Sequence, residues 1–297
     1  MDPKLIDTHT HVNFQAFKSD SDEVIQRSLD SGVWMINAGT KFETSRAAVE
    51  LAENYSDGVY AAVSLHPIHL FEHHVDISEE GRSFNGAGEE FDMDAYRDLI
   101  SRSIKVVAIG EFGLDYYRLP KNVDPEEIKQ KQKEVMIEHI KLAREVNKPL
   151  MIHCRPSEGT MDAYEDVLKI LDQYCVLFSP PREGAMSGEV RGFEIHCFTG
   201  SSDIAQEFVK RGGYIALNGI ITFDKSGRSD EVVKNLPLEW AILETDAPYL
   251  TPMPHRGKRN EPSYVRYVAE KFAEMKGIEP AEVERVTTAN ARKLFRI

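Results

Sequence analysis

The sequence predicts an α/β protein, a (β/α)₈ TIM barrel that occupies residues 1–297 as one domain. Eight short apolar runs alternate with longer segments of helical periodicity. The runs are apolar throughout, which is typical of parallel strands buried on both faces. Polar side chains able to carry chemistry end six of the runs, and closure of a barrel brings such scattered strand ends to one point. A doubly wound open sheet is the structural alternative.

The predicted strands are residues 4–8, 33–38, 59–65, 105–111, 150–154, 192–197, 214–218 and 240–245. The clearest helix lies between the fourth and fifth strands, where apolar residues recur with helical spacing. Asp124 and Pro125 are typical of a helix start. Asn147, followed by Lys148 and Pro149, is typical of a helix end.

Two segments exceed the usual length of loops. Residues 68–92 follow the third strand, so we expect them on the catalytic face, where the carboxyl ends of the strands lie. Residues 179–191 precede the sixth strand, and we expect them on the opposite face. The last helix, at about residues 280–294, is expected to pack outside the barrel.

Composition and charge argue against several classes of protein. The net charge of -13 and the pI of about 5.3 disfavour a protein that coats nucleic acid, because such affinity comes from Lys and Arg. The chain shows neither a signal-peptide core nor an apolar run of transmembrane length, so we expect no membrane association. The three cysteines are an odd, sparse set that fits a reducing, cytoplasmic location. The sequence indicates no oligomeric state, and a monomer is consistent with it.

Histidines and carboxylates at strand ends form the candidate site. His9 and His11 end the first strand, and residues two apart on a strand point the same way, which favours a metal clamp over incidental histidines. Glu111 follows the apolar fourth strand, where a metal ion or a neighbouring arginine would offset the cost of a buried carboxylate. The other candidate ligands end the fifth, sixth and eighth strands: His153, His196 and Asp246. Asp246 could also accept a proton from bound water.

Polar residues next to these ligands have alternative roles. Asp7 points the same way as the two N-terminal histidines, either as a ligand or as a partner that orients an imidazole. Glu244, one pleat below Asp246, is expected to brace the barrel through a salt link or a hydrogen bond. His66, after the third strand, is expected to contact substrate or transfer a proton, with a structural hydrogen bond as the alternative.

Several other histidines and cysteines are interpreted as non-catalytic. By strand alternation, Cys154 and Cys197 should point away from the adjacent histidines, so we interpret them as packing residues. The histidines within residues 68–92, namely His69, His73 and His74, are expected in solvent. His139 is expected at a surface or an interface.

The order of these motifs resembles the TatD family of metal-dependent hydrolases and deoxyribonucleases, within the amidohydrolase-like barrels. The matching motifs span nearly the whole chain: DTHTH at 7–11, LHP at 65–67, GEFGLD at 110–115, HCR at 153–155, HCFTG at 196–200, ETDAPYL at 244–250, PHRGKRNEP at 254–262 and TTANARKLF at 287–295. The HxH motif alone is weak evidence for this family, but the full set of motifs in this order is highly specific for it.

The resemblance implies two divalent metal ions, of which Mg, Mn and Zn are the candidates. It implies that His9, His11, Glu111 and Asp246 hold one ion, and that Glu111, His153 and His196 hold the other. It further implies hydrolysis of phosphodiester bonds in DNA or RNA, typically from the 3′ end. For this activity we expect Glu111, Asp246 and His66 to be the catalytic residues.

Basic residues after the strands are candidates for binding substrate phosphate. Arg155 and the run of Arg256, Lys258 and Arg259 are favoured, since arginine can hold a phosphate bidentately. Four others are interpreted as solvated loop charges: Arg118, Lys121, Lys225 and Arg228. Residues 68–92 carry seven acidic side chains, which would repel a long polyanion, so we expect strand ends or short oligonucleotides as substrates.

Two other functions stay open. The first is an amidohydrolase that cleaves C–N or ester bonds of a small metabolite. Many such barrels bridge their ions with a carboxylated lysine on the fourth strand, whereas here that strand ends in Glu111 and carries Lys105 at its start. The second is a non-catalytic binding barrel, which the intact ligand set disfavours because buried carboxylates and imidazoles without metal are costly.

Overall fold

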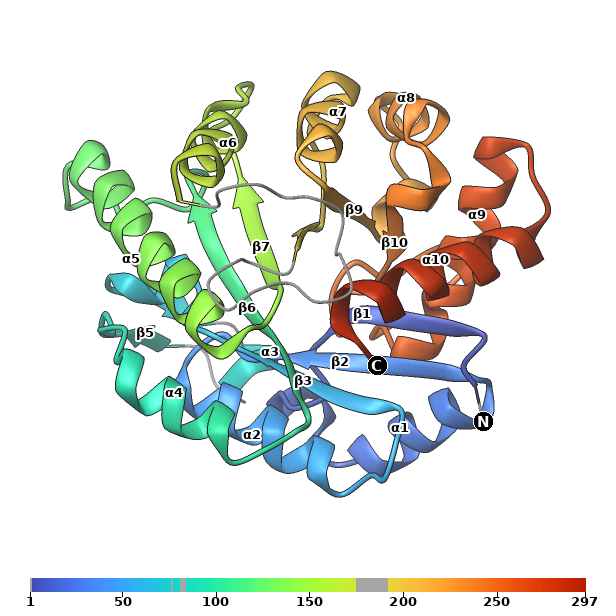
Figure 1. The fold of residues 1–297 in the computed structure, drawn as a ribbon, viewed down its shortest axis with the longest axis horizontal. Coiled ribbons are helices and arrows are strands. Elements are labelled where there is room, and N and C mark those ends of the chain that lie inside the picture. The colour runs from blue at the N-terminus through green and yellow to red at the C-terminus, as the bar shows by residue number, and fades with distance from the viewer. Residues whose placement is uncertain (1, 76, 81–83, 175–191) are drawn as a thin grey trace.

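The computed structural model describes residues 2–75, 77–80, 84–174 and 192–297. Its main sheet has eight strands in the order β1-β2-β3-β6-β7-β8-β9-β10, and every neighbouring pair is parallel. A bridge between Thr10 and Ala247 joins the end of the first strand to the segment after the last, so the barrel is nearly closed (Figure 1). The predicted (β/α)₈ barrel is therefore confirmed.

The strands agree closely with those predicted: β1 (Leu5–Thr10), β2 (Val33–Ala38), β3 (Val59–Val63), β6 (Val106–Asp115), β7 (Leu150–Arg155), β8 (Phe193–His196), β9 (Gly213–Leu217) and β10 (Ala241–Leu243). The largest difference is β6, which continues four residues beyond Glu111, to Asp115. This extension pairs Asp115 with Arg155 on β7, and both residues matter for the site described below.

Helices surround the strands in the order of the chain (Figure 1): α1 (Ser21–Asp30), α2 (Phe42–Glu53), α4 (Met93–Ser101), α5 (Pro125–Val146), α6 (Asp162–Tyr174), α7 (Ser202–Lys210), α8 (Arg228–Asn235), α9 (Val265–Lys276) and α10 (Pro280–Phe295). The ends of α5 are as predicted. The side chain of Asp124 accepts a hydrogen bond from the backbone of Glu126, and Asn147 ends the helix in the left-handed region (φ 55°).

The last helix, α10, is placed differently from the sequence prediction. Its residues Leu294 and Phe295 pack against side chains of the barrel interior, such as Ile36 and Ile242. Thr288 donates a hydrogen bond to the carbonyl of Lys4, just before β1 (2.9 Å). The helix therefore covers the N-terminal end of the barrel, because its apolar face meets interior side chains that the strands leave uncovered there.

Residues 68–92 form structure of their own. A short 3₁₀ helix, η2 (Pro67–Leu70), is followed by an antiparallel pair, β4 (His73–Val75) and β5 (Phe84–Gly86), with α3 (Ile77–Glu80) between them. Glu79 contacts Thr40, which follows β2, so the segment lies on the catalytic face as predicted. Residues 179–191, expected on the opposite face, lie outside the described residues.

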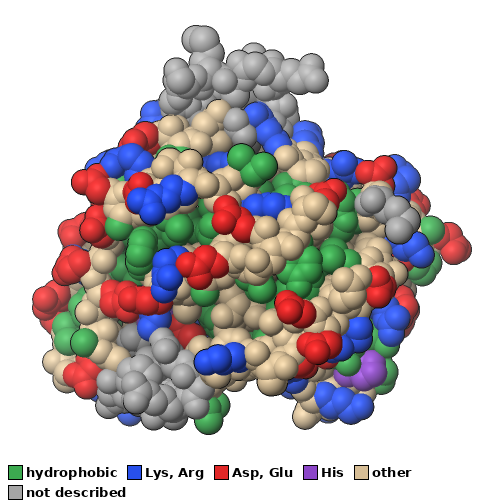
Figure 2. Space-filling model, turned by 90° about the horizontal axis from the view of Figure 1, so that it is seen from below, with side chains coloured by type: hydrophobic (Ala, Val, Ile, Leu, Met, Phe, Trp, Pro, Cys, Tyr) green, Lys and Arg blue, Asp and Glu red, His purple; other side chains and the backbone are tan. Residues whose placement is uncertain are grey.

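The outer surface fits the acidic composition. Figure 2 shows the side formed by α1, α2 and α4, where acidic and basic side chains are mixed without a continuous basic stripe. None of the helices in the described ranges combines the length and the apolar character needed to cross a bilayer.

Candidate metal centre and cavity

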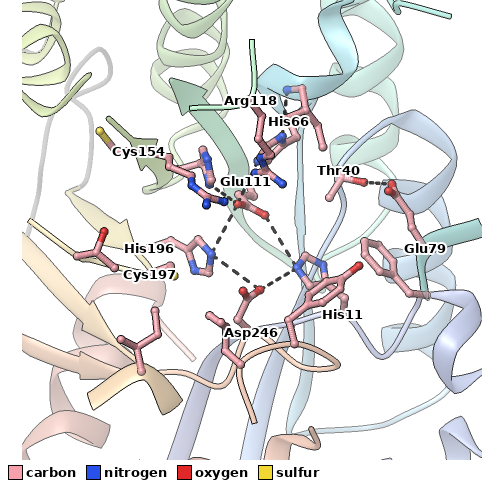
Figure 3. A pocket seen from close by; sticks show the side chains of 18 residues that line it. His11, Thr40, His66, Glu79, Glu111, Arg118, Cys154, His196, Cys197 and Asp246 are labelled. Carbon is pink, nitrogen blue, oxygen red and sulfur yellow. Dashed lines mark hydrogen bonds and ion pairs between the residues drawn. The ribbon is translucent and has the colours of Figure 1, made fainter. Parts of the chain in front are cut away.

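A cavity of about 470 Å³ opens at the carboxyl ends of the strands (Figure 3). Residues at or after the ends of all eight strands line it or lie directly beneath it, and the predicted ligands are among them: His9, His11, Glu111, His153, His196 and Asp246. His66 joins them from the end of the third strand. The barrel thus brings together residues up to 237 positions apart, since Asp246 lies 3.8 Å from Nε2 of His9.

His9 and His11 point their Nε2 atoms at each other. The Nδ1 of His11 donates to the carbonyl of Ala38 (2.9 Å), so Nε2 of the neutral ring is an acceptor. The Nδ1 of His9 lies 3.1 Å from the sulfur of Met151, and its Nε2 lies 3.1 Å from Nε2 of His11. Two acceptor nitrogens at this distance repel each other unless a proton or a metal ion lies between them.

His153 and His196 are each oriented by a carboxylate that contacts the ring nitrogen pointing away from the centre of the site. Nε2 of His153 lies 3.2 Å from Asp115, and Nδ1 of His196 lies 2.8 Å from Glu244. A carboxylate on the outer nitrogen keeps the proton there and leaves the inner nitrogen as an acceptor. The inner Nδ1 of His153 is buried and faces a carboxylate oxygen of Glu111 (2.7 Å), so among the described residues it lies opposite another acceptor and receives no hydrogen bond.

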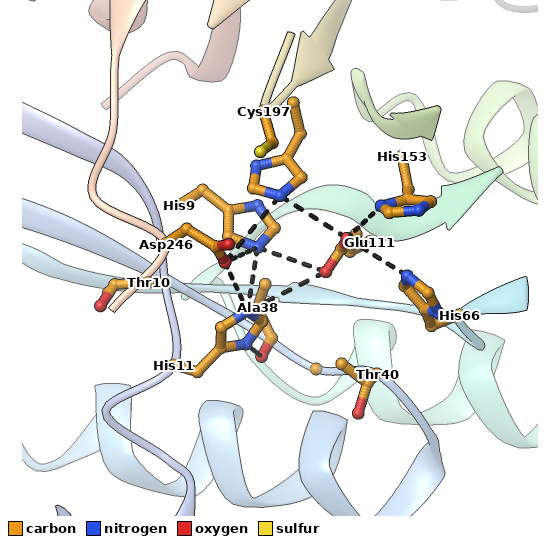
Figure 4. A network of polar contacts seen from close by, with 12 residues as sticks. His9, Thr10, His11, Ala38, Thr40, His66, Glu111, His153, Cys197 and Asp246 are labelled. Atoms are coloured by element: carbon orange, nitrogen blue, oxygen red, sulfur yellow. Dashed lines mark hydrogen bonds and ion pairs between the residues drawn. The ribbon is translucent and has the colours of Figure 1, made fainter. Parts of the chain in front are cut away.

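Glu111 divides its two oxygens between these pairs of histidines (Figure 4). Its Oε2 lies 3.3 Å from Nε2 of His9, whereas its Oε1 lies 2.7 Å from Nδ1 of His153 and 3.6 Å from Nε2 of His196. Burial alone would raise the pKa of Glu111, but the surrounding histidines outweigh it and hold the pKa well below the usual value. Glu111 is therefore an ionised carboxylate with one oxygen facing each pair of histidines.

Asp246 completes the arrangement on the other side of His9 and His11. Its Oδ1 lies 3.3 Å from Nε2 of His11 and 3.9 Å from Nε2 of His196. The four imidazoles and two carboxylates thus converge on one point, and each of these six side chains presents an acceptor atom to it. A centre surrounded by acceptor atoms is suited to binding a cation. Two of the groupings that could hold a metal ion are His9 with His11 and Asp246, and Glu111 with His66 and His153.

His66 differs from the other four histidines. Its Nδ1 accepts a hydrogen bond from the backbone of Ile68 (3.1 Å), so its Nε2 carries the proton of the neutral ring. That Nε2 lies 3.3 Å from Oε1 of Glu111. Burial outweighs the nearby carboxylate and lowers the pKa of His66 to about 3. The side chain is therefore a neutral hydrogen-bond donor directed into the site.

Glu244 and Asp7 brace the barrel below the ligands. Besides His196, Glu244 accepts hydrogen bonds from the backbone of Cys197 (2.8 Å) and the side chain of Asn218 (3.0 Å). Asp7 accepts from the backbone and the hydroxyl of Thr245 (2.8 and 2.6 Å). Glu244 orients a histidine as well as bracing the barrel, while Asp7 ties the first strand to the last.

Sequence reasoning missed Asp115 and Arg118. Asp115 contacts His153, and its Oδ2 also accepts from Nε of Arg118 (2.7 Å). Arg118, interpreted from the sequence as a solvated charge, lines the cavity. The signal was the spacing of Asp115 in the GEFGLD motif, four residues after Glu111, which places both on one face of a longer strand.

Of the four predicted phosphate-binding residues, Arg155 lines the cavity, whereas Arg256, Lys258 and Arg259 are not among its lining residues. Arg256 donates to the carbonyl of Thr251 (3.3 Å) and lies over the ring of Phe223. Arg259 makes a two-pronged ion pair with Asp20 (2.8 and 2.6 Å). The contact of this run with phosphate stays a prediction, and the placement of Arg259 favours a structural role.

Replacing Arg259 by glutamine should separate these roles. We expect the free energy of unfolding at neutral pH to fall by about 1 kcal/mol, with KM for substrate unchanged. Arg259 lowers the pKa of Asp20, so the pair contributes stability above the pKa of the unfolded chain. The difference in urea denaturation between wild type and Arg259→Gln should therefore shrink as the pH falls through the pKa of Asp20 in the folded protein. A raised KM with unchanged stability would instead restore the phosphate-binding role.

Two histidines are buried where the sequence suggested exposure. His69 is 1% exposed, and its Nε2 lies 3.2 Å from Glu79. His139 lies between the rings of Phe91 and Phe112 and accepts a hydrogen bond from the backbone of Leu65 (3.0 Å). Both predictions were wrong, because the folded 68–92 segment buries His69 and aromatic rings from other elements cover His139. The side chains of His73 and His74 lie outside the described residues.

The cysteines lie beside the cavity. Cys154 belongs to the apolar core between strands and helices, which confirms its packing role, although it also borders the cavity. Cys197 is partly buried next to His196 and Asp246 and could join a metal grouping with them. Burial raises the pKa of both thiols well above the usual value, which disfavours a thiolate at neutral pH.

The sequence matches the family model described as TatD related DNase over residues 6–296. The chain belongs to the TatD family. A relative from Bacillus subtilis, described as the uncharacterized metal-dependent hydrolase YabD, is 40% identical over 296 residues and 99% of both chains. The 3′-5′ ssDNA/RNA exonuclease TatD of Shigella flexneri is 29% identical over 300 residues, again 99% of both chains. The crystal structure of YJJV, a TatD homolog from Escherichia coli, superposes with a TM-score of 0.79 at 29% identity, covering 100% of both chains.

These similarities agree with the geometry of the TatD barrel described above. The protein is a metal-dependent hydrolase of the TatD family. Its cluster of imidazole and carboxylate side chains is suited to the metal that such a hydrolase requires.

Proposed function

We propose that this protein hydrolyses phosphodiester bonds at the 3′ end of single-stranded DNA or RNA, with two divalent metal ions. The division of the Glu111 oxygens between two pairs of histidines carries the proposal, because two ions that share one carboxylate would need this arrangement. The family description as DNase-related and the name of the Shigella relative support the choice of substrate.

The proposed ligands of one ion are His9, His11, Glu111 and Asp246, and those of the other are Glu111, His153 and His196. Bound there, two divalent ions would lower the pKa of a coordinated water and offset the charge that develops on the phosphate. The mixture of imidazole and carboxylate ligands suits Mg, Mn or Zn.

The chain's own side chains would do the remaining work. Asp246, whose side chain is 16% exposed, is open enough to accept a proton from the attacking water. His66 holds its Nε2 proton towards Glu111 and is placed to donate to an oxygen of the substrate. Arg155 lines the cavity and is placed to contact the substrate strand.

The position of Lys105 disfavours the amidohydrolase alternative. Lys105 lies before the start of β6, and its Nζ donates to the carbonyl of Ser56 (3.0 Å). It is thus at the opposite end of the strand from the candidate ligands, where a carboxylated lysine would not bridge two ions. The carboxylate available for bridging is Glu111.

Release of nucleotides from labelled oligonucleotides tests the function. Matched single-stranded DNA and RNA, labelled at the 5′ end, would be incubated with the protein and Mg, Mn or Zn, with and without EDTA. We expect a ladder that shortens from the 3′ end and stops when EDTA is added. A protein that leaves both polymers intact in all three metals, or cleaves them equally in EDTA, would contradict the proposal. The cytoplasmic location stays a prediction from the cysteine content.

A further inference from the structure

The walls of the cavity differ in chemistry. Arg118, after β6, lines it near His66 (Figure 3). Arg155, the last residue of β7, and His153 line it as well. Near His11 the lining is aromatic, because the ring of Phe14 stacks on the imidazole with centroids 4.4 Å apart. An anionic group bound in the cavity would therefore be drawn towards the arginine side.

Arg118 is fixed in direction by Asp115. The carboxylate accepts from Nε (2.7 Å) and lies 2.6 Å from Nη2, so it occupies one edge of the guanidinium. Within the described part of the chain, the other edge has no hydrogen-bond partner, and the side chain is 44% exposed towards the cavity. A guanidinium with one edge held and the other open is pre-oriented for two oxygens of a phosphate.

Tyr117, the preceding residue, is exposed. Its neighbour Tyr116 is buried and donates its hydroxyl proton to Asp166 (3.0 Å), whereas Tyr117 is 52% exposed. The guanidinium of Arg155 lies over the ring of Tyr117, 4.1 Å from its centroid. The ring and the guanidinium thus form a flat, cationic surface, and Arg155 lines the same cavity as Arg118.

We propose that Tyr117 and Arg155 form a stacking platform for the nucleobase next to the cleaved bond, and that Arg118 binds the phosphate of the same nucleotide. This nucleotide subsite rests on the phosphodiesterase function proposed above and specifies how the strand is held. Aromatic rings and guanidinium planes bind any base through its π face, so the platform tolerates all sequences. Because a base in a duplex stays stacked on its neighbours, the platform favours unpaired ends.

The platform is tested in two ways: the ring of Tyr117 is removed by mutation, and the base beside the cleaved bond is removed from the substrate. KM would be measured for a short single-stranded DNA and for the same strand with an abasic residue beside the cleaved bond. We expect Tyr117→Ala to raise KM for the intact strand about tenfold and to leave KM for the abasic strand unchanged. Tyr117→Phe keeps the ring and should resemble the wild type with both strands. An equal effect on both strands, or none, would overturn the platform.

The phosphate contact is tested with inorganic phosphate as a competitive inhibitor at saturating metal. We expect Arg118→Gln to weaken inhibition about tenfold and Arg118→Lys to weaken it less, with the bound metal unchanged. Arg46→Gln, an exposed arginine paired with Glu50 on α2, is the matched control and should behave as wild type. Loss of metal with unchanged phosphate inhibition would show that Arg118 acts only through Asp115 and His153, and would overturn the contact.

Failure of the proposed phosphodiesterase function can be distinguished from failure of the nucleotide subsite. A wild-type protein that releases no nucleotides would overturn the function and leave the subsite testable by fluorescence anisotropy, with the same two strands and the metal-loaded protein. Weaker binding of the intact strand alone by Tyr117→Ala would support the platform. Binding that is equal for both strands in wild type and variant would overturn it.

Discussion

Replacing Glu111 by alanine is expected to remove nearly all turnover and most of the bound metal while the barrel stays folded. The carboxylate faces His9 through one oxygen and His153 through the other, so its loss takes a ligand from both proposed ions. We expect turnover to fall on the order of 10³-fold or more, as when charge stabilisation is lost from an active site. The fold should persist because the eight strands and their apolar cores do not depend on this side chain.

Metal content and activity would be measured together for Glu111→Ala and for Glu111→Gln, which keeps the size of the side chain and removes its charge. Circular dichroism would show that both variants are folded. Glu138→Ala, at an exposed glutamate paired with Lys141 on α5, is the control and should retain metal and activity. Activity of Glu111→Ala close to that of wild type in metal-replete buffer would refute the bridging role.

The strands and the ligands were predictable because both depend on local sequence. Strands buried on both faces are apolar throughout, and the helix α5 carries its start and end signals at Asp124 and Asn147. The shared direction of the His9 and His11 side chains follows from the two-residue repeat of a β-strand, and this repeat does not depend on where the strand ends. To predict that these ligands meet at one site, we also had to assume that the sheet closes into a barrel. The polar residues at the ends of six predicted strands supported that assumption.

Features that depend on packing between distant segments were not predictable. His69 and His139 are polar residues in a loop and a helix. His69 is buried by the way residues 68–92 fold back on themselves, and His139 by the ring of Phe91, 48 positions away. Arg118 appeared as one of several loop charges, because its direction is fixed by Asp115 on a strand longer than predicted. Arg259 has an acidic partner, Asp20, 239 positions away, which no local pattern indicates.

The partners outside the ligands explain how the site is kept ready for metal. Each of four histidines has a different group on its outer nitrogen: the sulfur of Met151, the carbonyl of Ala38, and the carboxylates of Asp115 and Glu244. These groups come from β2, β6, β7 and the segment after β10, so the orientation of each imidazole depends on the register of the barrel. The two carboxylates raise the electron density on their imidazoles most, which makes His153 and His196 the ligands most sensitive to their outer partners.

Replacing Glu244 by glutamine should therefore weaken metal binding without preventing catalysis. Glu244 lies 2.8 Å from Nδ1 of His196 and also accepts from Asn218, and a glutamine of the same shape keeps an acceptor but loses the charge. We expect the apparent affinity for metal to fall about 10- to 100-fold, with kcat restored at high metal concentration because the ligands themselves are intact. Titration of the metal-free protein with Mn, followed by activity, measures both quantities.

A second buried glutamate of the barrel provides the matched control. Glu194 is fully buried two residues before His196, and its oxygens have no hydrogen-bond partner among the described residues. Burial raises the pKa of Glu194 well above the usual value, which favours the neutral form, and glutamine is nearly isosteric with that form. Glu194→Gln should thus leave metal affinity close to that of wild type. Equal losses in the two variants would show that general disturbance of the barrel interior, and not the contact with His196, sets the affinity for metal.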